Sequence, residues 1–226
     1  THEDVARLLG APGFDAATPF GAFIGVDAKR PDQYSVYLTQ AGLGMPNRDY
    51  YLDQKFADKQ AKYRAHIATM LTLAGVADAA AKADAIYALE NEIATIHWEP
   101  AKRRNRDLTY NLKTIEELEA YAPGAAWRAM LASAGLSGQS EIIVREDDAI
   151  QRLAALFAAT PVETWKDYLR FHLIDNNADV LPAAFDVLRL HRVEAACIPT
   201  NIASIRLLEK TGFRREGYAR SYLCIN

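Results

Sequence analysis

Cysteine is almost absent from this sequence. Cys197 and Cys224 are the only two, both within the last 30 residues, and the first 196 residues contain none. Two cysteines cannot form the disulfide framework of a small secreted domain, and this pair lacks the spacing of a zinc-binding motif. We therefore interpret both as small buried hydrophobic side chains.

Long apolar runs and an excess of one charge are also missing. No segment approaches the roughly 18 consecutive apolar residues that a membrane-spanning helix needs. Lysine and arginine total 26 against 29 aspartate and glutamate, a formal net charge of −3, and the two signs are interspersed. This balance argues against nucleic acid or an anionic membrane as a partner. Half of the 226 residues are apolar, enough for one large or two small domains with packed cores.

The first part of the chain predicts a small β-hairpin followed by a pair of helices. Residues 20–26 and 34–38 have strand character on either side of a turn. From Lys55 apolar residues recur at helical spacing until Gly75, which ends that helix. A second apolar stripe consists of Ile86, Leu89, Ile93 and Ile96. We expect these two helices to pack as an antiparallel pair.

Further helices are predicted downstream. Thr114 and Glu117 form a capping box that starts one helix, another helix covers residues 127–134, and residues 141–144 are a candidate short strand. Asp147 or Asp148 is expected to cap a helix that runs to residue 159. The Thr-Pro-Val-Glu sequence at residues 160–163 has a cap, a proline and a glutamate in the order that starts a helix. The fold class is therefore mainly α, a helical lobe with a small β-hairpin near the N-terminus.

Residues 40–52 are unusual because local propensity gives them no regular structure. They contain two glycines, one proline and an Asn-Arg-Asp triplet, and they end in two tyrosines and a leucine. Glycine and proline disfavour helix and strand, whereas a solvated linker would not carry such bulky side chains. This segment is therefore predicted to be a shaped loop packed against a core.

The same segment carries a family resemblance. Residues 42–51 resemble the Gly-Leu-Gly-Leu-Pro-Asp-Arg-Asp-Tyr-Tyr segment of the neprilysin and endothelin-converting-enzyme family of zinc metallopeptidases, differing at Met45 and Asn47. The order of other residues agrees with that family over about residues 5–185. They include Pro19, Phe20, Gly21, Glu90, Glu92, His97, Trp98, Arg103, Arg104, Asn105, Trp165 and His172.

The resemblance implies a partial peptidase amino-terminal domain at residues 1–186, mainly the helical lobe that roofs the catalytic cavity in that family. It also implies peptide substrates, hydrolysis by zinc-activated water and a periplasmic or secreted location. The chain begins at Thr1 without an initiator methionine or a leader, as a piece cut from a longer chain would.

The zinc motif of such peptidases is not present in this sequence. It requires His-Glu-x-x-His, two histidines one helical turn apart with a glutamate general base between them. The only His-Glu pair is His2-Glu3, and Ala6 stands at the position of the second histidine. The other histidines occur singly at positions 66, 97, 172 and 191. We therefore assign no catalytic and no metal-binding residue, and we expect the chain to be inactive alone.

A different pattern begins after Asp186. Residues 191–198 alternate like a strand, Asn201 can cap a short helix, and residues 217–225 alternate again, which predicts a strand–helix–strand tail. Residues 190–195 and 201–217 resemble the carboxy-terminal part of GNAT-type N-acetyltransferases. That resemblance implies a partial acetyltransferase segment at residues 187–226, cytoplasmic in that family. In it, Asn201 and Ser204 would lie near acetyl-CoA.

The pyrophosphate-binding loop of that second family is missing from its expected place upstream of His191. Residues 7–12 imitate it, but Pro12 has no backbone N–H to offer a phosphate. The basic residues 102–106 are interpreted first as a solvated face or as partners of nearby acids, and second as a phosphate or nucleic-acid site. Three functional hypotheses therefore stand: a partial zinc metalloendopeptidase, an acetyltransferase fragment, and a non-catalytic helical scaffold that binds peptides or partners.

Overall fold

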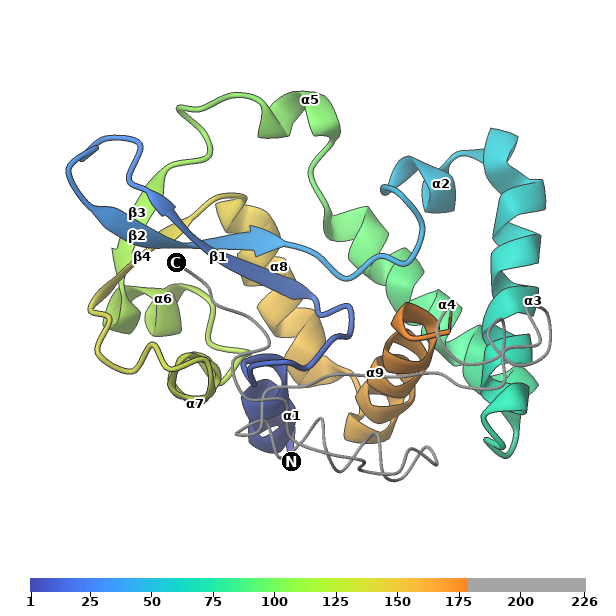
Figure 1. Cartoon of the computed structure of the whole chain (residues 1–226). Helices are drawn as coiled ribbons and strands as arrows, with labels where there is room; N and C mark the ends of the chain where they lie inside the picture. The colour runs from blue at the N-terminus through green and yellow to red at the C-terminus, as the bar shows by residue number, and fades with distance from the viewer. Residues whose placement is uncertain (179–226) are drawn as a thin grey trace, which may run out of the picture. The chain divides into compact units, whose positions relative to one another are not determined.

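The computed structural model describes residues 1–178, which form a small mixed sheet and the helices that pack against it (Figure 1). The strands in this part are β1 (Phe20–Val26), β2 (Tyr34–Gln40), β3 (Asn111–Thr114) and β4 (Glu141–Val144). The helices are α1 (His2–Leu9), α2 (Asp49–Leu52), the 3₁₀ turn η1 (Gln54–Phe56), α3 (Ala57–Leu73), α4 (Ala79–Ile96), α5 (Pro100–Arg103), α6 (Ile115–Tyr121), α7 (Trp127–Ser133), α8 (Asp147–Ala159) and α9 (Val162–Asn176).

The sheet has the strand order β1-β2-β4-β3 and is larger than the predicted hairpin. The hairpin itself is confirmed, because β1 and β2 pair antiparallel from Phe20 opposite Gln40 onward. The predicted strand at residues 141–144 is also confirmed, and it pairs parallel with β2. Strand β3 was not predicted, because Leu112 is its only apolar residue; it forms by antiparallel pairing with β4.

The core lies between this sheet and the helices. Helix α8 packs against β2 and α4, and α9 packs against α3 and α4 (Figure 1). One face of the sheet buries Val36 and Leu38, with alternate residues pointing the other way as the strand period requires. Large aromatic side chains contribute to the same core; those fully buried are Trp127, Phe157, Trp165, Tyr168 and Phe171.

The predicted helix pair is confirmed as α3 and α4. Gly75 adopts φ of +70° just after α3, the left-handed conformation that ends a helix most easily at glycine. Tyr63, in the first half of α3, contacts Glu90 in the second half of α4. Ala68 and Ala80, from the opposite halves, line one cleft. The two helices therefore run antiparallel.

Two predicted helix caps are wrong. Glu146, not an aspartate after it, occupies the cap position of α8, and its carboxylate makes no capping bond. Pro161 occupies the cap position of α9, while the Thr160 hydroxyl donates to the carbonyl oxygen of Leu156 at 2.8 Å. At both helix starts the polar side chain bonds to another part of the chain or to the preceding helix, and it does not cap the helix that follows.

The predicted tail of residues 187–226, with Asn201, Ser204 and the join at Asp186, lies outside the described residues. Among residues 1–178, no helix combines the length and the apolar character needed to cross a bilayer.

Candidate functional site

The 40–52 segment packs against α3 and α9 at its two glycines, which confirms the predicted packed loop. Gly42 has φ of +97°, and a Cβ there would lie 2.9 Å from the hydroxyl oxygen of Tyr168. A Cβ on Gly44 would lie 1.9 Å from the hydroxyl oxygen of Tyr63. The Tyr168 hydroxyl also donates to the carbonyl oxygen of Gly42 at 2.8 Å. No side chain fits at either position.

Glu90 of α4 is fully buried, and four donors converge on its carboxylate. Oε2 accepts the N–H of Gly44 at 3.1 Å and the hydroxyl of Tyr51. The Tyr63 hydroxyl lies 3.0 Å from both oxygens, and Nε2 of His172 lies 2.9 Å from Oε1. These bonds replace the water that the carboxylate loses on burial. This Glu90 cluster joins the 40–52 segment to α3, α4 and α9.

The tyrosines around Glu90 are held in their protonated form. The Tyr51 hydroxyl accepts the N–H of Met45 at 2.9 Å and donates to Glu90. Burial first, and the negative charge of Glu90 second, raise the pKa of both Tyr51 and Tyr63 far above the ordinary value. Burial likewise raises the pKa of Tyr168. The cluster therefore depends on phenol groups that keep their protons.

Alkaline destabilisation is the expected consequence. An unfolded tyrosine loses its proton near pH 10, whereas these folded ones do not. The folded state then binds more protons, so the free energy of unfolding falls as pH rises above 10, by up to about 1.4 kcal/mol per pH unit for each tyrosine. Urea unfolding between pH 8 and pH 11 measures this slope. Tyr63→Phe should make it shallower, and Tyr34→Phe, at an exposed position, should not. Equal slopes in all three proteins would contradict the assignment.

The end of α4 holds the segment at two further points. His97 donates from Nε2 to the carbonyl oxygen of Ala41 at 3.1 Å. Burial lowers the pKa of His97 to about 4, so the ring is neutral at pH 7. Arg48 donates from Nε to the carbonyl oxygen of Ala94 at 3.3 Å. Both ends of the loop are thus attached to the same helix.

A second buried carboxylate, Glu146, holds the beginning of the segment. It accepts the backbone N–H of Gln40 at 3.1 Å and Nε of Arg103 at 2.8 Å. The basic run at residues 102–106 therefore partly serves nearby acids, as predicted. Lys102 also lies 3.4 Å from Asp148. The phosphate or nucleic-acid alternative for this run stays a prediction.

The histidines of the described part lie apart from one another. His2 contacts the carbonyl oxygen of Thr160, His66 contacts Asp175, His97 contacts Ala41 and His172 contacts Glu90. Within residues 1–178, no three or more His, Cys, Asp or Glu side chains are grouped so that they could hold a metal ion. A catalytic zinc site uses three protein ligands, so a zinc ion does not fit this part of the chain.

Gly10, in the acetyltransferase-like residues 7–12, has a packing role. A Cβ at this position would lie 2.0 Å from the carbonyl oxygen of Met130. Glycine is therefore required where α1 crosses α7, and the loop shows no free cradle of backbone donors: the Gly10 and Ala11 N–H groups bond to the carbonyl oxygens of Ala6 and Leu8.

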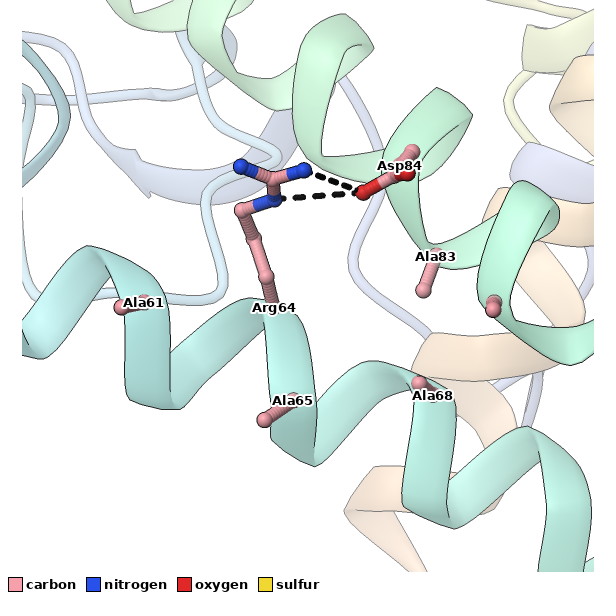
Figure 2. Close-up of a pocket in the computed structure, with 7 residues that line it drawn as sticks. Ala61, Arg64, Ala65, Ala68, Ala83 and Asp84 are labelled. Atoms are coloured by element: carbon pink, nitrogen blue, oxygen red, sulfur yellow. Dashed lines mark hydrogen bonds and ion pairs between the residues drawn. The ribbon is translucent and has the colours of Figure 1, made fainter.

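A surface cleft of about 290 Å³ lies between α3 and α4. Figure 2 shows Arg64 reaching from α3 toward Asp84 of α4, with its Nε 3.2 Å from Oδ1. The other lining residues are the alanines at positions 61, 65, 68, 80 and 83. The one ion pair is already neutralised and alanine has no reactive group, so this cleft offers no catalytic machinery.

In the sequence, Glu90 stands out only as one of the residues that agree with the peptidase family. Its place at the centre of this site was not predicted. One signal was available. Glu90 lies four residues after Ile86 and three before Ile93, so it falls on the buried stripe of its helix. A charged residue on a buried stripe indicates a group of compensating donors.

Comparison with known proteins shows similarity to peptidases. The family model described as Peptidase family M13 matches residues 1–194, which extends past the predicted join at Asp186. Endothelin-converting enzyme-like 1 of Mus musculus is 28% identical over 180 residues, covering 76% of this chain and 23% of that protein. Endothelin-converting enzyme 1 of Cavia porcellus is 25% identical over 174 residues, covering 74% and 23%. The chain therefore spans about a quarter of the length of these curated relatives.

Solved structures agree with this result. The zinc metalloprotease Zmp1 of Mycobacterium tuberculosis in complex with inhibitor superposes with a TM-score of 0.75 and 34% identity, covering 79% of this chain and 28% of that one. Zmp1 in its open state gives a TM-score of 0.76 and 30% identity, covering 94% and 35%. These matches support the peptidase resemblance, and the acetyltransferase resemblance of residues 187–226 has no counterpart among them.

Proposed function

The chain belongs to peptidase family M13, and from this premise we propose that it is the amino-terminal, mainly helical part of a zinc metalloendopeptidase that hydrolyses peptide bonds. In this proposal residues 1–186 supply a structural framework and no catalytic group. Zinc, when bound in such a peptidase, activates the attacking water. The ligands for it are not among the described side chains.

One observation carries the proposal. The stretch that most resembles the peptidase family, residues 42–51, is held in place through the Glu90 cluster and the packing of Gly44. A loop without regular structure keeps one shape only when its backbone groups are bonded to fixed partners. Here Glu90 fixes the N–H of Gly44, and Tyr168 fixes the carbonyl of Gly42. This loop is therefore part of the rigid scaffold of the peptidase.

Metal analysis and a peptidase assay on the purified 226-residue chain test the proposal. We expect far less than one zinc per chain and no cleavage of a fluorogenic peptide. The double variant His66→Gln/His97→Gln should leave both results unchanged, because neither histidine belongs to a cluster of side chains that could hold a metal ion. Stoichiometric zinc together with peptide cleavage would show that this chain carries its own active site.

The second candidate function is acyl transfer from acetyl-CoA by residues 187–226. Sequence resemblance favours it, and Asn201 and Ser204 are the residues proposed to lie near the cofactor. Titration with acetyl-CoA distinguishes it: micromolar binding that is weakened by Asn201→Ala and Ser204→Ala would support an acetyltransferase segment. A third candidate, a non-catalytic scaffold that binds peptides or partners, also predicts neither zinc nor acetyl-CoA binding, and it differs from the first in predicting that this chain alone binds peptides or partners.

A further inference from the structure

A second surface cleft, of about 390 Å³, lies on the sheet at the β1–β2 hairpin. Phe23 and Gly25 of β1 and Tyr37 of β2 contribute to it from the sheet. Arg106 and Tyr110, from the connection between α5 and β3, line it as well, together with Arg145 after β4. Three separate parts of the chain therefore meet around one opening, which we name the hairpin cleft.

The two arginines of the hairpin cleft differ from most arginines among residues 1–178. Arg30, Arg64 and Arg103 each form an ion pair with a carboxylate. Arg106 and Arg145 form none with any residue in the described part. Each guanidinium carries five N–H donors and no acceptor. The hairpin cleft therefore presents two positive groups whose bonding capacity the rest of residues 1–178 leaves unused.

The other polar groups of the hairpin cleft are already bonded. The Tyr37 hydroxyl donates to the carbonyl oxygen of Val26 at 2.9 Å and accepts the N–H of Ala28 at 3.0 Å. The Tyr110 hydroxyl donates to the carboxylate of Asp27 at 2.9 Å. Asp27 is fully buried and bonded to Arg30, which also pairs with Glu141, so its carboxylate is not open to a ligand. A ligand in the hairpin cleft would find cationic donors and no free anion.

The floor of the hairpin cleft is aromatic. The rings of Phe23 and Tyr37 stack with centroids 5.0 Å apart and an interplanar angle of 4°. Phe23 is nevertheless 44% exposed. Arg145 lies 6.0 Å from the Phe23 centroid, at the limit of a cation–π contact. Apolar surface of this kind next to unpaired cations favours a ligand that has an apolar part and a negative charge.

We propose that the hairpin cleft is a binding site for acidic peptide segments. A glutamate or aspartate side chain of the peptide pairs with Arg106 and Arg145, and a neighbouring apolar side chain covers Phe23. Charge complementarity selects the occupant: the guanidinium fork matches a carboxylate, and a peptide supplies the apolar neighbour that a free inorganic anion lacks. This site involves no zinc chemistry and does not depend on the proposed peptidase function.

NMR titration of the full chain with two capped peptides tests this proposal. The probes are acetyl-Phe-Glu-Phe-Glu-amide and its uncharged match acetyl-Phe-Gln-Phe-Gln-amide, and the reporters are the backbone amides of Gly25 and Arg145. We expect the glutamate peptide to bind at least about tenfold more tightly, because hydrogen bonds to charged groups are the stronger ones. Arg106→Gln and Arg145→Gln should each remove most of that preference.

Two further variants distinguish peptide binding in the hairpin cleft from non-specific attraction to positive charge. Arg152→Gln removes the same charge from an exposed arginine of α8 that lies outside the hairpin cleft and has no ion pair among residues 1–178, so it should leave binding within twofold. Gly25→Val places methyl groups in the hairpin cleft without changing charge, since a Cβ there makes ordinary contacts of 3.4–3.5 Å, and should weaken both peptides. Equal binding of the two peptides, or an Arg152→Gln effect as large as that of Arg106→Gln, would overturn the proposal.

Discussion

Glu90→Gln is expected to lower the free energy of unfolding by about 1–3 kcal/mol, the range found when a buried donor or acceptor is left without a partner. The carboxylate accepts bonds on both oxygens, from Gly44, Tyr51, Tyr63 and His172. A glutamine keeps the shape of the side chain but turns one of these acceptors into an NH₂ donor. At least one donor then faces another donor in a dry site, and its desolvation is no longer compensated. Urea unfolding at pH 7 measures the change.

Glu92→Gln is the matched control for this variant. It makes the same chemical change two residues away on the same helix, where the side chain is exposed, and should alter stability by less than about 0.5 kcal/mol. If Glu90→Gln does not fold, Tyr51→Phe removes only one of the donors and should cost about 1–2 kcal/mol. Limited proteolysis should cut residues 43–48 more quickly in both cluster variants. A Glu90→Gln protein as stable as the Glu92→Gln protein would refute the central role of the carboxylate.

Gly44→Ala is expected to destabilise the chain by about 2–3 kcal/mol, because it overpacks a site with no free space. The new methyl carbon would lie 1.9 Å from the Tyr63 hydroxyl oxygen and 2.8 Å from its Cζ. Gly44 is not among the glycines with positive φ, so the cost is steric and does not come from the backbone conformation. Gly138→Ala provides the control and should be nearly neutral, because a methyl group on Gly138 would meet no atom within 4 Å.

A double-mutant cycle locates the steric conflict. In a Tyr63→Phe background the hydroxyl oxygen is gone, so Gly44→Ala should cost about 1 kcal/mol less than it does in the parent chain, a coupling typical of residues in contact. The relief is partial because the ring carbon stays close. Additive effects of Gly44→Ala and Tyr63→Phe would mean that the loop does not pack on this tyrosine as the structure shows.

The helices show which features can be predicted from residues that are close together in the sequence. The apolar stripe of α4 and the left-handed glycine after α3 depend on residues within a few positions of one another, so spacing alone predicts both elements. The capping box of α6 was predicted for the same reason: Thr114 and Glu117 bond to each other's backbone N–H groups. The caps assigned to Asp147 or Asp148 and to Thr160 failed because other groups compete for the polar side chains at those helix starts: Trp98 bonds to the Asp148 carboxylate, and the Thr160 hydroxyl bonds to Leu156 of the preceding helix. Local pattern cannot detect that competition.

Sequence by itself determined the helix-rich class, the β1–β2 hairpin, the packed character of residues 40–52 and the family resemblance of that segment, because each rests on neighbours along the chain. Tertiary structure alone decided that β4 pairs parallel with β2, that β3 forms, and that Glu90 collects donors from the loop, α3 and α9. His172 lies 82 positions from Glu90 in sequence yet 2.9 Å from it in space. Only folding brings such groups together, since a buried carboxylate is stable only where every bond it lost to water is made again by the protein.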